Sequence, residues 1–183
     1  MSIKRYLETI VTGLTLLLLA GVTTGYAVDN ITETKIKAAY LYNFTKFIDW
    51  DAEFPSTPAS PITICVLGDN DIADNLEEVA NRLIKERPLQ IKRNNINDLN
   101  LLPRCNVLFI GNSTQQQFPE ILQALKGSHV LTVSDMPRFS YRGGAIGFFV
   151  EKDRVKIEIN ERAVREAGLK IGAQLMEVGR IVP

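Results

Sequence analysis

The sequence predicts an α/β fold: a Rossmann-like, doubly wound and mainly parallel sheet flanked by helices, with a C-terminal antiparallel hairpin and terminal helices. Apolar runs rich in β-branched residues at 62–67, 106–110 and 130–133 are typical of strands buried on both faces of a parallel sheet. Segments with helical spacing lie between them, and parallel strands need such crossover elements. A chain of 183 residues that is 45% hydrophobic can bury the core of this fold.

The N-terminus has the pattern of a secretory signal peptide. Lys4 and Arg5 precede an apolar run at 10–22, and Gly25 and Ala27 supply the small residues of a cleavage site. The run is shorter than the roughly 20 residues that span a bilayer, and an uncleaved anchor is the alternative. We therefore expect a signal peptide at 1–27 and a single exported domain at 28–183, which is not itself embedded in the membrane after cleavage.

The mature chain is expected to begin with an amphipathic helix at 32–48. Its apolar residues recur at spacings of three and four, and residues 30–33 have the pattern of a capping box. A proline-rich stretch at 55–61 cannot continue this helix and leads as a loop into the strand at 62–67. Helices are expected at 71–85 and 115–126, and a weaker strand at 89–92.

The C-terminal third has a different pattern. Segments 145–151 and 154–160 flank Lys152-Asp153 as a hairpin, and the second arm alternates apolar with polar residues, so one face is buried. Asn160 is placed to cap a short helix that Gly168 ends. A last helix is expected at 171–178.

The sequence gives little sign of an enzyme. His129 is the single histidine, and without a second histidine or a spare cysteine it is a poor metal site. No serine lies in a nucleophile elbow, and no phosphate-binding loop or dinucleotide fingerprint follows a strand. We expect no catalytic residues, no metal and no cofactor. A formal net charge of zero argues against nucleic acid as a partner.

Polar residues follow three predicted strands at their carboxyl ends. They are Asp69 and Asn70, Asn112 and Ser113, and Ser134 and Asp135. Open α/β sheets bind ligands at this edge, so these residues are predicted to line a small-ligand crevice. The alternative is that the same residues only cap helices and form turns.

Two further features concern the cysteines and two aromatic residues. Cys65 and Cys105 are the only cysteines, and an even number in an exported protein favours a disulfide, the alternative being two buried free thiols. Tyr42 and Trp50 fall off the main apolar stripe of the first helix. We predict that they belong to a protein interface, where Tyr and Trp are enriched.

Two separated signatures resemble the YfiR-like periplasmic proteins. Residues 37–50 (KAAYLYNFTKFIDW) resemble the opening of that family, and residues 143–150, 154–160 and 167–171 resemble its glycine-hairpin-helix ending, in the same order. Some relatives carry a second cysteine pair in the hairpin region, which this chain lacks, while the family's stabilising disulfide maps onto Cys65 and Cys105.

The resemblance implies a non-enzymatic periplasmic regulator. Such proteins bind the periplasmic sensor region of an inner-membrane diguanylate cyclase and repress it, which lowers cyclic di-GMP and the output of biofilm and exopolysaccharide. An OmpA-like outer-membrane lipoprotein is implied as a second partner, and a homodimer is a further expectation. The alternative function is a periplasmic sensory domain that binds a small ligand in the strand-end crevice.

Overall fold

The computed structural model describes residues 26–50 and 60–183, with side chains from residue 32 onward. The expected signal peptide lies outside the described residues except for its last two positions, and so does most of the proline-rich loop. Residues 33–183 form one compact unit. Within the described ranges, no helix combines the length and the apolar character needed to cross a membrane.

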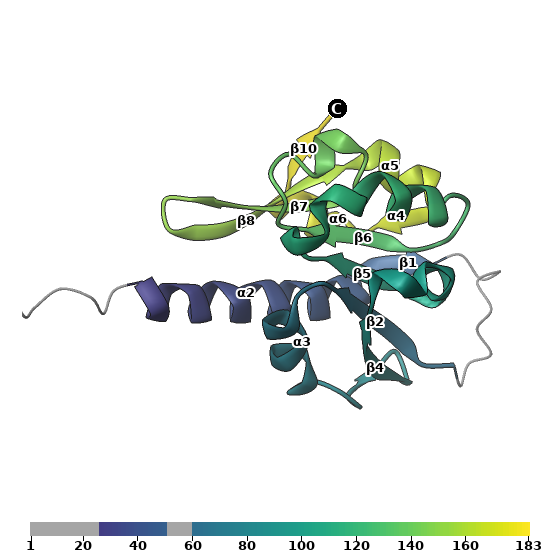
Figure 1. Cartoon of the computed structure of the whole chain (residues 1–183), viewed down its shortest axis with the longest axis horizontal. Coiled ribbons are helices and arrows are strands. Elements are labelled where there is room, and N and C mark those ends of the chain that lie inside the picture. Colours follow the sequence, from purple (N-terminus) through teal and green to yellow (C-terminus); the bar gives the residue numbers. More distant parts are fainter. Residues whose placement is uncertain (1–25, 51–59) are drawn as a thin grey trace, which may run out of the picture. The chain divides into compact units, whose positions relative to one another are not determined.

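Within the described residues, eight strands form a mixed sheet in the order β10-β8-β7-β6-β5-β2-β4-β3 (Figure 1). The strands β7, β6, β5, β2 and β4 run parallel, whereas β8 and β3 are antiparallel to their neighbours β7 and β4. The bounds are β2 Ile62–Leu67, β3 Leu83–Ile84, β4 Arg87–Asn94, β5 Val107–Ile110, β6 Leu131–Ser134, β7 Ile146–Glu151, β8 Arg154–Asn160 and β10 Arg180–Val182. The mainly parallel α/β sheet with an antiparallel hairpin confirms the predicted fold class.

Helices cover both faces of this sheet. The helices are α2 Tyr26–Phe47, α3 Asn70–Glu77, α4 Phe118–Ala124, α5 Glu161–Glu166 and α6 Ala173–Val178, with 3-10 helices η1 Ile96–Arg104, η2 Asn112–Gln117 and η3 Ser140–Arg142. Alternate residues of β2 enter two separate apolar clusters, as the two-residue period of a strand requires. Ile64 belongs to the cluster that contains residues of α2, α3, α5 and α6, whereas Leu67 belongs to the cluster that contains residues of η1 and α4.

A second, two-stranded ladder follows the first helix. The strand β1 Ile48–Trp50 pairs antiparallel with β9 Leu169–Ile171, and Trp50 lies opposite Leu169. The expected helix at 32–48 begins six residues before its predicted start, at Tyr26, so residues 30–33 lie inside the helix and do not cap it. It also ends one residue early, since Ile48 already belongs to β1. Neither β9 nor β10 was predicted, because three-residue strands are too short for an alternating pattern to be visible.

The expected helix at 71–85 is wrong in its second half. The helix α3 ends at Glu77, and the chain then turns into the antiparallel pair β3–β4, with positive φ at Lys85 and Glu86. Leu83, which continues the helical period, is 69% exposed. Pairing with β4 overrides the local helical pattern here, because the ladder provides hydrogen-bond partners for the backbone of β3 and of the start of β4.

The other expected elements lie close to their predicted positions. The region 115–126 consists of η2 followed by α4, whose first turn contains Pro119, a residue that fits the start of a helix. The hairpin β7–β8 turns at Lys152 and Asp153, both with positive φ. Asn160 Oδ1 accepts a hydrogen bond from the Ala163 N–H and caps α5.

A disulfide joins Cys65 in β2 to Cys105 at the end of η1. Both cysteines are 1% exposed and belong to the apolar cluster with α4. The bond connects residues 40 positions apart. It therefore fastens the crossover segment between β4 and β5 to β2, an interior strand of the sheet.

Candidate functional site

The carboxyl ends of β2, β5 and β6 meet at one edge of the sheet. These strands are neighbours, so the topology brings together the three pairs of residues predicted for the crevice. Asn70, Asn112 and Ser113 are exposed, whereas Asp69 and Asp135 are half-buried and Ser134 is fully buried. The sequence therefore placed these residues at a common edge correctly.

Several polar atoms at this edge form hydrogen bonds within the chain. Asp69 Oδ1 accepts from the Ile72 N–H at 3.0 Å and caps α3. Ser113 Oγ donates to the Gly68 carbonyl at 2.6 Å, and Ser134 Oγ donates to the Ile110 carbonyl at 2.6 Å. These bonds are the contacts expected if the residues only cap helices and form turns, which is the alternative to a ligand crevice. Ligand binding here stays a prediction.

The loops after β2 and β5 also approach each other closely. A Cβ atom at Gly111 would lie 2.6 Å from the Gly68 carbonyl oxygen, so only glycine fits at position 111. The Gly111 N–H donates to the Leu67 carbonyl at 2.7 Å. The backbone of one loop therefore fills the space beside the other. The carboxylates of Asp69 and Asp135 lie close enough at this edge for their charges to interact.

A charge cluster at this edge includes a lysine that the sequence analysis did not single out. Lys37 Nζ, from α2, lies 2.6 Å from Asp135 Oδ2 and 2.6 Å from Glu33 Oε1. Lys37 is only 8% exposed. The one sequence signal for it is the four-residue spacing from Glu33, which is an ordinary helical ion-pair spacing. Its pairing with Asp135 joins α2 to the strand-end edge.

Burial and neighbouring charges shift two pKa values in this cluster. Burial lowers the pKa of Lys37, but the hydrogen bonds to Asp135 and Glu33 outweigh it, so the net pKa of Lys37 is raised. Burial, together with the charges of Asp135 and Asp71, raises the pKa of Asp69. The cluster therefore holds a firmly protonated amine beside a carboxyl group that is harder to ionise than usual.

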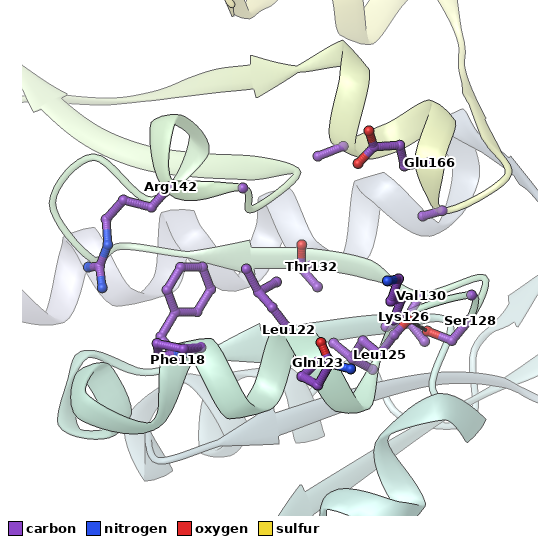
Figure 2. Close-up of a pocket in the computed structure, with 15 residues that line it drawn as sticks. Phe118, Leu122, Gln123, Leu125, Lys126, Ser128, Val130, Thr132, Arg142 and Glu166 are labelled. Carbon is purple, nitrogen blue, oxygen red and sulfur yellow. Dashed lines mark hydrogen bonds between the residues drawn. The ribbon is translucent and has the colours of Figure 1, made fainter.

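A groove of about 850 Å³ lies elsewhere, between α4, β6 and α5. In Figure 2, Phe118 and Leu122 project from α4 toward the strand that carries Thr132, and Glu166 comes from α5. Arg142 lies 5.0 Å from the Phe118 ring centroid. Sequence reasoning missed this groove, because its walls come from segments whose proximity depends on the tertiary fold.

The two predicted interface residues are half-buried and lie on different elements. Tyr42, in α2, has Lys46 Nζ 4.0 Å from its ring centroid and the Arg82 guanidinium carbon at 6.0 Å. Trp50 ends β1, and its Nε1 has no hydrogen-bond acceptor among the described residues. Both rings pack against the larger apolar cluster. Their predicted contact with a partner is not tested by this geometry.

The described residues contain no group of three or more His, Cys, Asp or Glu side chains suited to a metal ion. His129, the single histidine, is half-buried and lies against Gly168, where an added Cβ would be 2.7 Å from its Nδ1. It therefore packs at the junction between the start of β6 and the end of α5.

Comparison with known proteins identifies a family, and the solved structures of similar fold include the two that follow. A family model described as YfiR/HmsC-like matches residues 34–180. A conserved domain protein from Vibrio cholerae is 10% identical with a TM-score of 0.55, over 80% of this chain and 60% of that one. An ABC domain in complex with L-Trp from Streptococcus pneumoniae is 11% identical with a TM-score of 0.49, over 66% of this chain and 55% of that one. The chain thus spans 60% and 55% of the length of these two proteins. The similarity to the Vibrio cholerae protein concerns the fold alone.

Proposed function

We propose, because the chain belongs to the YfiR/HmsC-like family, that it is a periplasmic regulatory protein without catalytic activity of its own. In this proposal it binds the periplasmic sensor region of an inner-membrane diguanylate cyclase and represses the enzyme. Cyclic di-GMP then falls, and biofilm and exopolysaccharide output fall with it. The family match over nearly all of the domain is the observation that carries this proposal.

Repression of this kind requires a difference in affinity between two states of the cyclase. A regulator that bound the active and inactive conformations equally would shift nothing, and a near-complete switch needs a preference of about 10⁴-fold. The regulator must therefore present a defined surface to one conformation. The buried core of residues 33–183 and the Cys65–Cys105 disulfide support such a preformed surface.

We place part of that surface at Tyr42 and Trp50. Both rings are half-buried, so each combines a packed side with an accessible one, as aromatic residues at interfaces do. Lys46 and Arg82 surround the Tyr42 ring with positive charge. A partner surface with acidic and apolar groups would complement this arrangement.

The matched test of this surface uses two variants. Tyr42→Ala combined with Trp50→Ala is expected to weaken binding of the cyclase periplasmic region by more than about tenfold, as loss of central aromatic contacts does. Tyr141→Ala removes an aromatic ring that is 45% exposed in another part of the chain and should leave the affinity unchanged. Unchanged affinity of a folded double variant would show that the rings are not the contact.

A second protein partner and self-association extend the proposal. We propose that an OmpA-like outer-membrane lipoprotein sequesters the regulator and so releases the cyclase. A homodimer is also proposed, since the terminal strand β10 lies at the edge of the sheet and exposes Ile181, and Val178 at the end of α6 is exposed as well. Light scattering on the purified mature protein distinguishes a dimer from a monomer.

The cellular test compares cyclic di-GMP with and without the gene. Deletion should raise cyclic di-GMP, and the wild-type gene supplied in trans should restore the lower level. A version with Cys65→Ser and Cys105→Ser should restore it poorly, because it lacks the bond that fastens η1 to β2. No change on deletion would contradict repression of a cyclase.

A further inference from the structure

A basic cavity opens at the amino-terminal edge of the sheet, the edge opposite the predicted crevice. It measures about 550 Å³, within the usual range for small-molecule sites, and lies where β4, β2, β5 and β6 begin. Its walls carry four cationic side chains, those of Arg87, Lys92, Arg104 and Lys126, and His129 lies beside them. Among the described residues that line it, none is an aspartate or a glutamate.

This concentration of positive charge contrasts with the rest of a chain whose formal net charge is zero. Other basic residues, such as Arg93, Lys156 and Arg180, form ion pairs with nearby carboxylates. In the part of the chain that the structure describes, the arginines and lysines of the cavity form none. A concave site lined by charges of one sign raises the local concentration of the opposite ion.

One of these cations is held in a fixed position. Arg87 Nε donates to the Ser60 carbonyl at 2.6 Å, and Nη2 donates to the Pro61 carbonyl at 3.2 Å. Burial lowers the pKa of Arg87, but an arginine remains protonated in a protein. Its remaining N–H groups are therefore available as charged donors without a further cost of ordering the side chain.

A buried amide adds a second, independent sign of a ligand. Asn106 lines the cavity and is 2% exposed. Its Oδ1 accepts from the Thr63 N–H at 2.9 Å, which sets the orientation of the amide because that N–H can only donate. Its Nδ2 has no acceptor among the described residues. A buried donor without an acceptor is costly, and a ligand oxygen would satisfy it.

The disulfide joins two walls of this cavity. Cys105 lies between Arg104 and Asn106, and Cys65 is paired with Lys92 across the β2–β4 ladder. The covalent bond therefore keeps the basic residues of η1 beside those of β4. A site whose walls are fixed in advance loses less entropy on binding than one that must be assembled.

We propose that this cavity binds a small polyanion that carries phosphate or carboxylate groups. Charge-assisted hydrogen bonds from the arginines and lysines hold the negative groups, and the Asn106 amide, which also lines the cavity, supplies a neutral donor. The site lies apart from the Asp69 and Asp135 cluster, where carboxylates would repel an anion. It is a separate property from the regulatory function proposed above, and either can fail without the other.

Calorimetric titration of the purified mature protein with pyrophosphate and with citrate, at low ionic strength, tests the proposal. Arg104→Gln combined with Lys126→Gln removes two exposed charges of the cavity. Lys152→Gln combined with Arg154→Gln removes two exposed charges at the β7–β8 hairpin and is the matched control.

The wild type and the control pair are expected to bind at least one probe with one site per chain. The cavity pair should bind it more weakly by at least about tenfold. Binding of pyrophosphate only identifies a phosphate ligand, and binding of citrate only identifies a carboxylate ligand. Absence of binding to both probes at about 1 mM, where even weak specific sites fill, overturns the proposal. Equal losses in the two pairs also overturn it, since they would reflect only the overall charge.

The Asn106→Asp variant examines the amide separately. An aspartate keeps an oxygen for the Thr63 N–H but replaces the donor group with an acceptor. The affinity for the bound probe should fall by more than about tenfold, provided that circular dichroism shows a folded protein. Undiminished affinity in the folded variant would remove Asn106 from the site. Should this buried substitution prevent folding, the exposed pair decides the question.

Discussion

Removal of the Cys65–Cys105 disulfide should lower the stability of the protein by a large and calculable amount. The bond joins residues 40 positions apart, and the chain-entropy model assigns a loop of that size about 4 kcal/mol. This is an upper figure, because residual structure in the unfolded chain reduces it. With a urea m-value of about 2 kcal/mol/M, the unfolding midpoint should fall by about 2 M.

The assay is urea unfolding followed by circular dichroism, with and without a thiol reductant. The urea midpoint of the wild type should fall when reductant is added. The variant with Cys65→Ala and Cys105→Ala should unfold at the lower midpoint in both conditions. Both sulfur atoms are buried in an apolar cluster, so the double variant also loses some packing. A midpoint in the wild type that reductant moves by less than about 0.5 M would refute the reasoning.

Three further substitutions test the charge cluster and one close backbone approach, each by urea unfolding. The raised pKa of Asp69 favours its protonated form in the folded state, so its contribution to stability is fully present below the unfolded pKa and is lost as pH rises through the folded value. The Asp69→Asn variant keeps the helix cap and does not titrate, so its stability relative to the wild type should be higher at pH 7 than near pH 4. A difference that does not depend on pH would contradict this reasoning. Lys37→Met leaves Asp135 without its cation and should lower the free energy of unfolding by about 1–3 kcal/mol, which is less than for a fully buried pair because the Asp135 side chain is partly exposed. A change near zero would show that the pair contributes nothing to stability. Gly144→Ala would place a methyl carbon 2.1 Å from the buried Phe139 ring and should lower the free energy of unfolding by about 2 kcal/mol or more. An unchanged urea midpoint would mean that the ring moves away freely.

The parts of the fold with a strong local pattern were predictable. The strand at 62–67 was predicted with the same first and last residues that β2 has, because its continuous apolar run matches a strand buried on both faces. The bounds predicted for the alternating arm at 154–160 also match those of β8. The helix at 71–85 was not, because its apolar spacing continues past the point where pairing with β4 ends the helix at Glu77. Local periodicity does not contain that tertiary pairing.

The same distinction applies to the sites. The common edge of 69–70, 112–113 and 134–135 follows from the rule that parallel strands end together, so topology alone was sufficient. The pairing of Lys37 with Asp135 spans 98 positions, and neither residue is unusual in its own segment. The basic cavity draws its charges from β4, η1 and the turns beside α4 and β6. Only the folded chain shows that these cations share one cavity without a carboxylate among its described lining residues.

The most direct measurement of the central claim is cyclic di-GMP synthesis by the cyclase in purified membrane vesicles, with the mature protein added to the face that carries the periplasmic region. The account predicts that synthesis falls saturably as the protein is added. Addition of the Tyr42→Ala and Trp50→Ala variant should require a concentration higher by about tenfold for the same inhibition. Synthesis that is unaffected by saturating wild-type protein, under conditions where the cyclase alone is active, would contradict the regulatory function.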